Sequence, residues 1–162
     1  MIQNQQVRNR AAKVKLLLMD VDGVLTNGKL YHFPDAAGNM IETKGFDSQD
    51  GIALQWMQWK GLRTGVISGR DSLATAERAR QTKINYVYQG HIEKVPILEE
   101  IMEKAQLQAD EIAYMGDDFT DIVVMRRVGI CHCGGQCAAG SAARGALCDK
   151  ERRGRGCGAG SG

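Results

Sequence analysis

A short apolar run at residues 14–19 ends directly in an acidic pair, Asp20 and Asp22. Such a run fits a buried strand, and two carboxylates one residue apart at its carboxyl end can both point into the crevice where open parallel sheets bind ligands. A strand followed by an Asp-Gly turn explains the same residues, because aspartate and glycine are common in turns. The other motifs along the chain decide between these two interpretations.

Strand-like runs alternate with helical stretches in most of the chain. Further strands are predicted at 62–67, 84–88 and 111–115, and helices at 48–60, 71–82 and 96–107. This alternation predicts an α/β fold, a doubly wound, Rossmann-like parallel sheet with helices on both faces. Two short apolar runs around the segment from Pro34 to Gly38 predict a small β-hairpin.

The helix predicted at 48–60 carries Ile52, Trp56 and Trp59 on one face. Aromatic residues at this spacing usually belong to a core or to a subunit interface, so we expect one of these two environments. Ser48 is expected to cap the start of this helix and Gly61 its end.

Polar residues also follow the other predicted strands. Ser68 and Gly69 come after the second strand, where a hydroxyl and a backbone N–H can hold a phosphate oxygen. Lys94 stands where the next helix begins, and Asp117 and Asp118 follow the fourth strand. Each motif alone has a turn or helix-cap explanation. Their order after successive strands favours chemistry on a phosphate group.

These side chains suit magnesium-assisted phosphoryl transfer. Asp20 would attack phosphorus and become an aspartyl phosphate, while Asp22 would protonate the leaving oxygen and later deprotonate water. Asp117 would join both as a ligand of Mg²⁺, whose charge offsets the repulsion between the carboxylates. Ser68 and Lys94 would hold the phosphoryl group.

With these motifs the chain resembles the haloacid dehalogenase superfamily of phosphohydrolases, and within it the 3-deoxy-D-manno-octulosonate 8-phosphate phosphatase family. The closer resemblance covers about residues 13–130. It rests on these segments: Asp22 to Thr26, Phe46 followed by Asp50-Gly51, Ser68-Gly69-Arg70, Tyr88 to Gly90, and Gly116 to Asp118. It implies a cap-less enzyme in which the hairpin replaces a cap domain, and a homotetramer whose neighbouring subunits complete each active site.

The resemblance also implies hydrolysis of a sugar acid phosphate in lipopolysaccharide biosynthesis. It places the metal on the backbone carbonyl of Asp22, and gives Asp118 and Asp121 the orientation of metal-bound water or Lys94. Arginines suit a sugar-acid carboxylate because they can donate two hydrogen bonds to it. The implied substrate contacts are Asp22, Asp47, Ser48, Gln49, Asp50, Gly51, Gly69, Arg70, Arg78 and Lys94. Two alternatives stay open: a nonulosonate 9-phosphate as the substrate, and a weakly active oligomeric domain that supports a sugar-nucleotide enzyme.

Charge and hydropathy exclude other classes. A net charge of +2 is too small to suggest nucleic-acid binding. No apolar run approaches the roughly 18 residues that cross a bilayer, and the polar start is no secretory signal. We therefore expect a cytoplasmic protein with neither nucleic acid nor membrane as a partner, and a flexible, frayed terminus at residues 1–12.

Residues 131–162 break the pattern. They hold all five cysteines and show no apolar periodicity, so we expect no further strand after Gly129. A zinc site at Cys131, His132, Cys133 and Cys137 fits no common ligand spacing, and disulfides are rare in cytosolic proteins. Codons compatible with this segment can be read in the adjacent frame as a strand, a helix and a family-like tail. We therefore interpret the segment as a frameshift product, disordered at 152–162, that lowers stability and catalysis.

Overall fold

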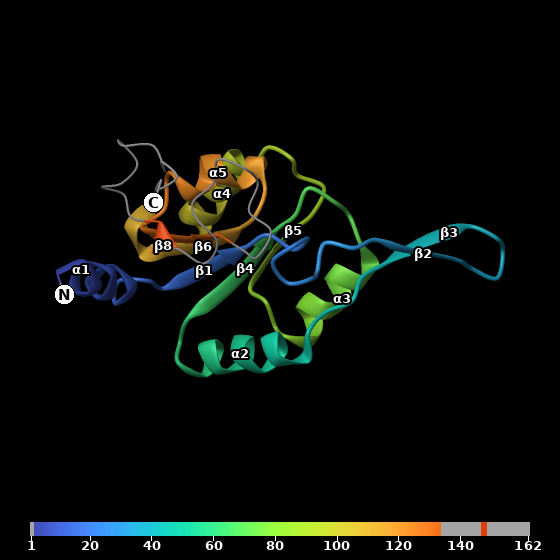
Figure 1. Cartoon of the computed structure of the whole chain (residues 1–162), viewed down its shortest axis with the longest axis horizontal. Coiled ribbons are helices and arrows are strands. Elements are labelled where there is room, and N and C mark those ends of the chain that lie inside the picture. The colour runs from blue at the N-terminus through green and yellow to red at the C-terminus, as the bar shows by residue number, and fades with distance from the viewer. Residues whose placement is uncertain (1, 134–146, 149–162) are drawn as a thin grey trace, which may run out of the picture.

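The first apolar run forms strand β1 (Leu16–Met19), in which every residue is buried. In the computed structural model, residues 2–133, 147 and 148 are described (Figure 1). Most of the predicted frameshift product, its disorder at 152–162 and Cys137 of the zinc alternative lie outside these residues. The domain boundary that we expect near residue 130 stays a prediction.

The described strands form a six-stranded sheet in the order β5-β4-β1-β6-β7-β8, and a separate two-stranded hairpin. The first five strands of the sheet run parallel, and β8 pairs antiparallel with β7. Their bounds are β4 Arg63–Ile67, β5 Tyr86–Tyr88, β6 Ile112–Gly116, β7 Ile130–Cys133 and β8 Leu147–Cys148. The predicted α/β class and the predicted strands are confirmed.

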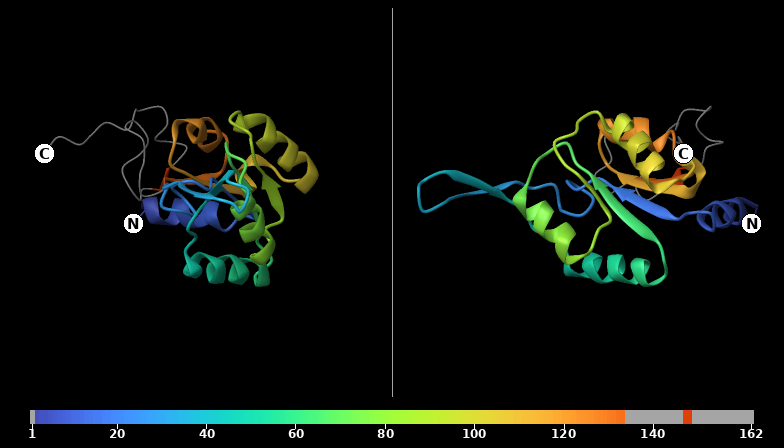
Figure 2. Two further views of the ribbon diagram at one scale, coloured as in Figure 1. Left: turned by 90° about the vertical axis from the view of Figure 1, so that its right-hand side faces the viewer. Right: turned by 180° about the vertical axis from the view of Figure 1, so that it is seen from behind.

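Helices cover both faces of the sheet. Helices α2 (Ser48–Trp59) and α3 (Leu73–Gln81) lie on one side, and α4 (Lys94–Ala105) and α5 (Phe119–Met125) on the other (Figures 1 and 2). Successive residues of β1 serve the two layers, because Leu16 and Leu18 pack in the α4/α5 core whereas Leu17 and Met19 pack with Leu54 of α2. A strand buried on both faces needs a continuous apolar run, which is how β1 could be recognised.

Strand β7 corrects one expectation. We expected no strand after Gly129, but Ile130 to Cys133 pair in parallel with β6 from Ala113 to Gly116. Cys131 and Cys133 are buried in the same core as Leu16. Cysteine behaves as a small apolar residue when buried, and four residues are too short a run for periodicity to reveal.

The predicted hairpin is present as β2 (Tyr31–Pro34) and β3 (Met40–Thr43), which extend away from the sheet (Figures 1 and 2). An isolated bridge between Thr26 and Phe46 joins the two chain segments at its base. The segment expected to be a frayed terminus forms helix α1 (Ile2–Ala11), and a short 3-10 helix, η1 (Ala109–Glu111), precedes β6. Among the described helices, none has the length and apolar character that a membrane crossing requires.

Helix α2 differs from the prediction in its cap and in its buried face. Its N-cap is Asp47, whose Oδ1 accepts a hydrogen bond from the backbone N of Gln49 at 2.8 Å, so the expected Ser48 cap is off by one residue. The side chains of Ile52, Trp56 and Trp59 are 53%, 61% and 76% exposed, so a core position for this face is wrong. The interface alternative stays a prediction. Gly61, at φ +79°, follows the end of the helix as expected.

Candidate active site

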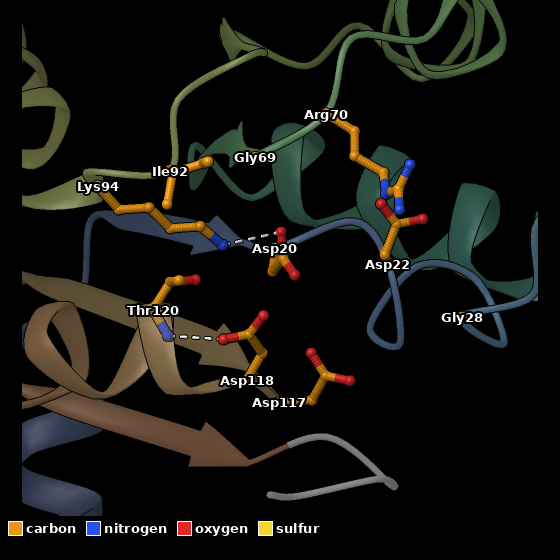
Figure 3. Close-up of a pocket in the computed structure, with 10 residues that line it drawn as sticks. All are labelled: Asp20, Asp22, Gly28, Gly69, Arg70, Ile92, Lys94, Asp117, Asp118 and Thr120. Atoms are coloured by element: carbon orange, nitrogen blue, oxygen red, sulfur yellow. Dashed lines mark hydrogen bonds and ion pairs between the residues drawn. The ribbon is translucent and has the colours of Figure 1, made fainter.

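The carboxyl ends of the central strands open onto one pocket of about 660 Å³. Asp20 follows β1, Gly69 and Arg70 follow β4, and Asp117 follows β6, so the parallel sheet gathers residues that are far apart in sequence (Figure 3). The lining residues are Asp20, Asp22, Gly28, Gly69, Arg70, Ile92, Lys94, Asp117, Asp118 and Thr120.

Three carboxylates form a cluster at this pocket: Asp20 and Asp117 line it, and Asp121 is buried next to them. One oxygen each of Asp20, Asp117 and Asp121 lie within 4.8 Å of one another. The sequence predicted that Asp20 and Asp117 would come together, and they do (Figure 3). The carboxylate of Asp22 is not a member of this cluster, which leaves its backbone carbonyl as the group proposed for the metal.

Asp121 accepts hydrogen bonds from several groups around the cluster. Its Oδ1 accepts hydrogen bonds from the Lys94 ammonium at 2.7 Å and the Tyr114 hydroxyl at 2.6 Å. Its Oδ2 accepts from the backbone N–H groups of Asp117 and Asp118 at 3.0 and 3.2 Å. Asp121 is fully buried, and these four donors occupy both of its oxygens. It therefore positions Lys94 and the loop after β6, and has little capacity left for a metal ion.

Lys94 is the buried cation of the site. It is the first residue of α4, and its Nζ lies 2.9 Å from Asp20 Oδ1 as well as close to Asp121. Burial alone would lower the pKa of Lys94, but the charges of Asp20 and Asp121 raise it overall. Burial raises the pKa of Asp20, and the Lys94 ammonium partly offsets that effect. The pair therefore favours a charged lysine, while the pKa of Asp20 stays above its ordinary value.

The surroundings of Asp117 disfavour the negative charge of its carboxylate. Burial first, and then the charges of Asp20, Asp121 and Asp118, raise its pKa to about 6. Its Oδ1 is buried and has no hydrogen-bond partner among the described residues. Hard carboxylate oxygens with spare acceptor capacity are what Mg²⁺ prefers, so the residues present fit this cation.

Gly23 makes the approach of the two acidic loops possible. Its φ is +84°, and a Cβ built on it would lie 1.8 Å from Asp117 Oδ2. A side chain at this position would both strain the backbone and displace the Asp117 carboxylate. The glycine of the Asp20-Val21-Asp22-Gly23 motif is therefore part of the geometry of the site.

Asp118 is the N-cap of α5. Its Oδ1 accepts a hydrogen bond from the backbone N of Thr120 at 2.6 Å, and a reciprocal contact with Asp121 completes a capping box (Figure 3). The helix-cap explanation of this acidic stretch is thus correct for Asp118. Both explanations hold together, because the same loop also presents Asp117 to the pocket.

The residues after β4 form the opposite wall. Ser68 is buried, and its Oγ accepts a hydrogen bond from the backbone N of Arg70 at 3.1 Å, but it is not among the residues that line the pocket. Arg70 lines the pocket and its Nη1 donates to Glu42 Oε2 at 3.3 Å. Glu42 lies on β3, so the hairpin contacts this wall.

The contact of Lys44 with Asp22 was not predicted from the sequence. Its side chain is completely buried, and its Nζ lies 2.8 Å from Asp22 Oδ2 and 3.7 Å from Glu42 Oε1. A lone lysine is usually solvated, so nothing about Lys44 by itself predicts this contact. The one usable signal is its spacing from Glu42, because residues two positions apart in extended chain lie on the same side.

The remaining predicted contact residues lie outside the pocket lining. Asp47 to Gly51 form the start of α2, and Arg78 lies on α3. The Arg78 guanidinium donates to the backbone carbonyl of Asp47 at 2.5 Å and lies 5.8 Å from the centre of the Phe46 ring. Burial and the charge of Asp47 raise the pKa of Asp50. These residues are assembled with one another and not with Asp20 and Asp117.

Comparison with known proteins gives the family. The chain is 34% identical over 125 residues to the 3-deoxy-D-manno-octulosonate 8-phosphate phosphatase of Yersinia pestis, an alignment that covers 76% of this chain. The chain spans 64% of the length of that curated relative. No family model matches the chain.

Solved structures agree with this relationship. The crystal structure of the Yersinia pestis phosphatase superposes with a TM-score of 0.76 at 31% identity, over 83% of this chain and 70% of that one. The Moraxella catarrhalis phosphatase, solved in complex with magnesium, phosphate and KDO, superposes with a TM-score of 0.76 at 30% identity, over 83% and 75% of the two chains. The chain therefore belongs to the 3-deoxy-D-manno-octulosonate 8-phosphate phosphatase family of the haloacid dehalogenase superfamily.

Proposed function

We propose that this protein is a magnesium-dependent phosphatase that hydrolyses 3-deoxy-D-manno-octulosonate 8-phosphate to the free sugar acid and phosphate. The observation that carries the proposal is the convergence of Asp20, Asp117 and Lys94 at the carboxyl edge of a parallel sheet. The names of the relatives and the KDO, phosphate and magnesium in the Moraxella catarrhalis structure support the choice of substrate and cofactor.

Two residues of the first motif perform the bond changes. Asp20 attacks phosphorus through a carboxylate oxygen, the bond from phosphorus to the ester oxygen breaks, and Asp22 donates a proton to that oxygen. Water then attacks the phosphorus of the aspartyl phosphate, the bond between phosphorus and the Asp20 oxygen breaks, and Asp22 takes the proton that the water loses. Inorganic phosphate leaves, and Asp20 is again a free carboxylate. Each residue returns to its starting state, because the proton that Asp22 gives in the first step comes back in the second.

The other polar groups hold the phosphoryl group. Lys94 offers a permanent positive charge next to Asp20, and Asp121 fixes its ammonium in place. Ser68 and the backbone of Gly69 bind phosphoryl oxygens from the opposite wall. Asp20, Asp117 and the backbone carbonyl of Asp22 would hold Mg²⁺, which would neutralise negative charge on the phosphoryl oxygens.

Substrate recognition is assigned to residues around the pocket mouth. Arg70 lines the pocket and can bind the carboxylate of a sugar acid. We propose that Asp47, Ser48, Gln49, Asp50, Gly51 and Arg78 contribute from a neighbouring subunit, since they lie outside the pocket lining of their own chain.

A homotetramer is the proposed assembly. The hairpin carries exposed apolar side chains that a monomer would leave in water, including Tyr31, Phe33, Met40 and Ile41, which are 41% to 63% exposed. Light scattering coupled to size exclusion measures the mass directly, and a monomer at micromolar concentration would contradict the proposal. The predicted cytoplasmic location is checked by fractionating cells that express the protein.

One assay tests the activity and separates the candidate substrates. Phosphate release is measured with Mg²⁺ for 3-deoxy-D-manno-octulosonate 8-phosphate and for a nonulosonate 9-phosphate at matched concentrations. We expect a higher kcat/KM for the eight-carbon substrate. The reverse order would identify a nonulosonate phosphatase. Little or no release from either would favour the weakly active oligomeric domain that supports a sugar-nucleotide enzyme.

A further inference from the structure

The base of the hairpin buries a cation against the proposed proton donor. Lys44 directly follows β3, its side chain has no exposed surface, and its Nζ lies 2.8 Å from Asp22 Oδ2. Among the described residues, Lys44 donates this hydrogen bond to the Asp22 carboxyl group. The other oxygen, Asp22 Oδ1, is buried and accepts no hydrogen bond there.

The contact with Lys44 fixes where the Asp22 carboxyl group lies. Asp22 lines the pocket, and proton transfer requires the donor oxygen within hydrogen-bond distance of the leaving oxygen. Burying a lysine is costly unless a carboxylate compensates its charge, so the pair holds both side chains in one arrangement. We propose that Lys44 is a positioning residue for catalysis, which fixes the Asp22 carboxyl group in the pocket wall where the leaving-group oxygen departs.

Glu42 of the hairpin contacts both Lys44 and the wall of the pocket. Glu42 stands two residues before Lys44 on the same face of the strand, with Oε1 3.7 Å from the Lys44 Nζ and Oε2 3.3 Å from the Arg70 Nη1. One edge of the hairpin therefore contacts two separate strand ends, the first through Asp22 and the second through Arg70. The position of the hairpin therefore helps to set the position of Asp22, the proposed proton donor.

The inference rests on the proposed function, because it concerns the first chemical step. In that step the phosphorus–oxygen bond of the ester breaks as the bond to Asp20 forms, and the proton on the Asp22 carboxyl group passes to the departing oxygen. A leaving group that is stable as an anion needs this proton less. Loss of Lys44 should therefore slow the hydrolysis of esters with poor leaving groups selectively.

The test compares two esters of nearly equal shape. The kcat/KM values for phenyl phosphate and p-nitrophenyl phosphate, which report the steps up to release of the phenol, are measured at saturating Mg²⁺ for the wild type and Lys44→Met. We expect a loss of about 10- to 100-fold for phenyl phosphate and less than about threefold for p-nitrophenyl phosphate. Lys29→Met, at an exposed lysine before the hairpin, is the control and should change neither value.

A second measurement separates positioning from a general structural role. If Lys44 acts through Asp22, Lys44→Met causes no further loss in phenyl phosphate hydrolysis when Asp22→Asn is already present. If Lys44→Met does not fold, as judged by circular dichroism, Lys44→Gln takes its place. We expect it, too, to lose more activity on phenyl phosphate than on p-nitrophenyl phosphate. Equal losses on both esters, or additive losses in the double variant, overturn the inference alone. A wild type that releases no phosphate from 3-deoxy-D-manno-octulosonate 8-phosphate overturns the proposed function and this inference with it.

Discussion

Replacing Asp117 with asparagine should stabilise the metal-free protein while it removes the metal site. Burial and the neighbouring charges of Asp20, Asp121 and Asp118 raise the pKa of Asp117 to about 6. An ionised Asp117 is therefore less favourable in the metal-free fold than in the unfolded chain. An amide of the same shape has no charge and avoids this cost.

The size of the effect follows from the pKa. The shift from 3.8 to about 6 corresponds to about 3 kcal/mol. The side chain is partly exposed, so solvent screening reduces this to roughly 1 to 2 kcal/mol. The folded state holds the proton more tightly than the unfolded state does, so this contribution to stability is present below about pH 4 and is lost as the pH rises through about 6.

The assay is urea denaturation of both proteins in the presence of a chelator. At pH 8 we expect a free energy of unfolding that is about 1 to 2 kcal/mol higher for Asp117→Asn than for the wild type, and about half that difference at pH 5. Mg²⁺ at 100 times its Kd should add about 2.7 kcal/mol to the wild type and nothing to the variant. A variant that is less stable than the wild type at pH 8 in chelator would refute the reasoning.

Three further substitutions examine other parts of the site. Asp20→Asn removes the nucleophile, so no phosphoenzyme should be trapped by acid quenching; substantial residual turnover would rule out the assignment. Asp121→Asn weakens a buried network around Lys94 and should cost about 3 to 5 kcal/mol in urea denaturation, against less than about 1 kcal/mol for Asp110→Asn in the exposed pair with Lys13. Similar costs for the two would contradict the network. Gly23→Ala places a Cβ 1.8 Å from Asp117 Oδ2 and should weaken Mg²⁺ binding in calorimetry, whereas an unchanged affinity would argue against this steric account.

The strands and the central acids were predictable because they follow from local rules. A strand such as β1 that is buried on both faces must be apolar throughout, and the carboxyl ends of parallel strands must meet at one edge. These two constraints were enough to place Asp20 and Asp117 side by side. They were not enough for β7, because its apolar character is carried by Cys131 and Cys133.

The contacts that hold the site could not be predicted, because they depend on which side chains meet across distant segments. Lys44 binds Asp22 from 22 positions away, and nothing in the sequence predicted it. That Asp121 orients Lys94, from 27 positions away, was implied by the family resemblance alone. Helix α2 shows the same limit for packing. Leu54 is its buried apolar residue, whereas Trp56 and Trp59 are exposed. Which face of the helix is buried depends on how the helix packs on the sheet, and the sequence of the helix alone does not give this.

The charge balance of the cluster links metal binding to substrate binding. Three carboxylates, on Asp20, Asp117 and Asp121, face the single ammonium of Lys94, so the ionised cluster has an excess of two negative charges. A phosphate ester that approaches this surface without a cation meets repulsion at short range and low dielectric. One divalent ion cancels the excess and leaves Lys94 to attract the phosphoryl oxygens. Removal of Mg²⁺ should therefore weaken the binding of inorganic phosphate as well as stop turnover, and calorimetry with phosphate measures the first effect without any catalysis.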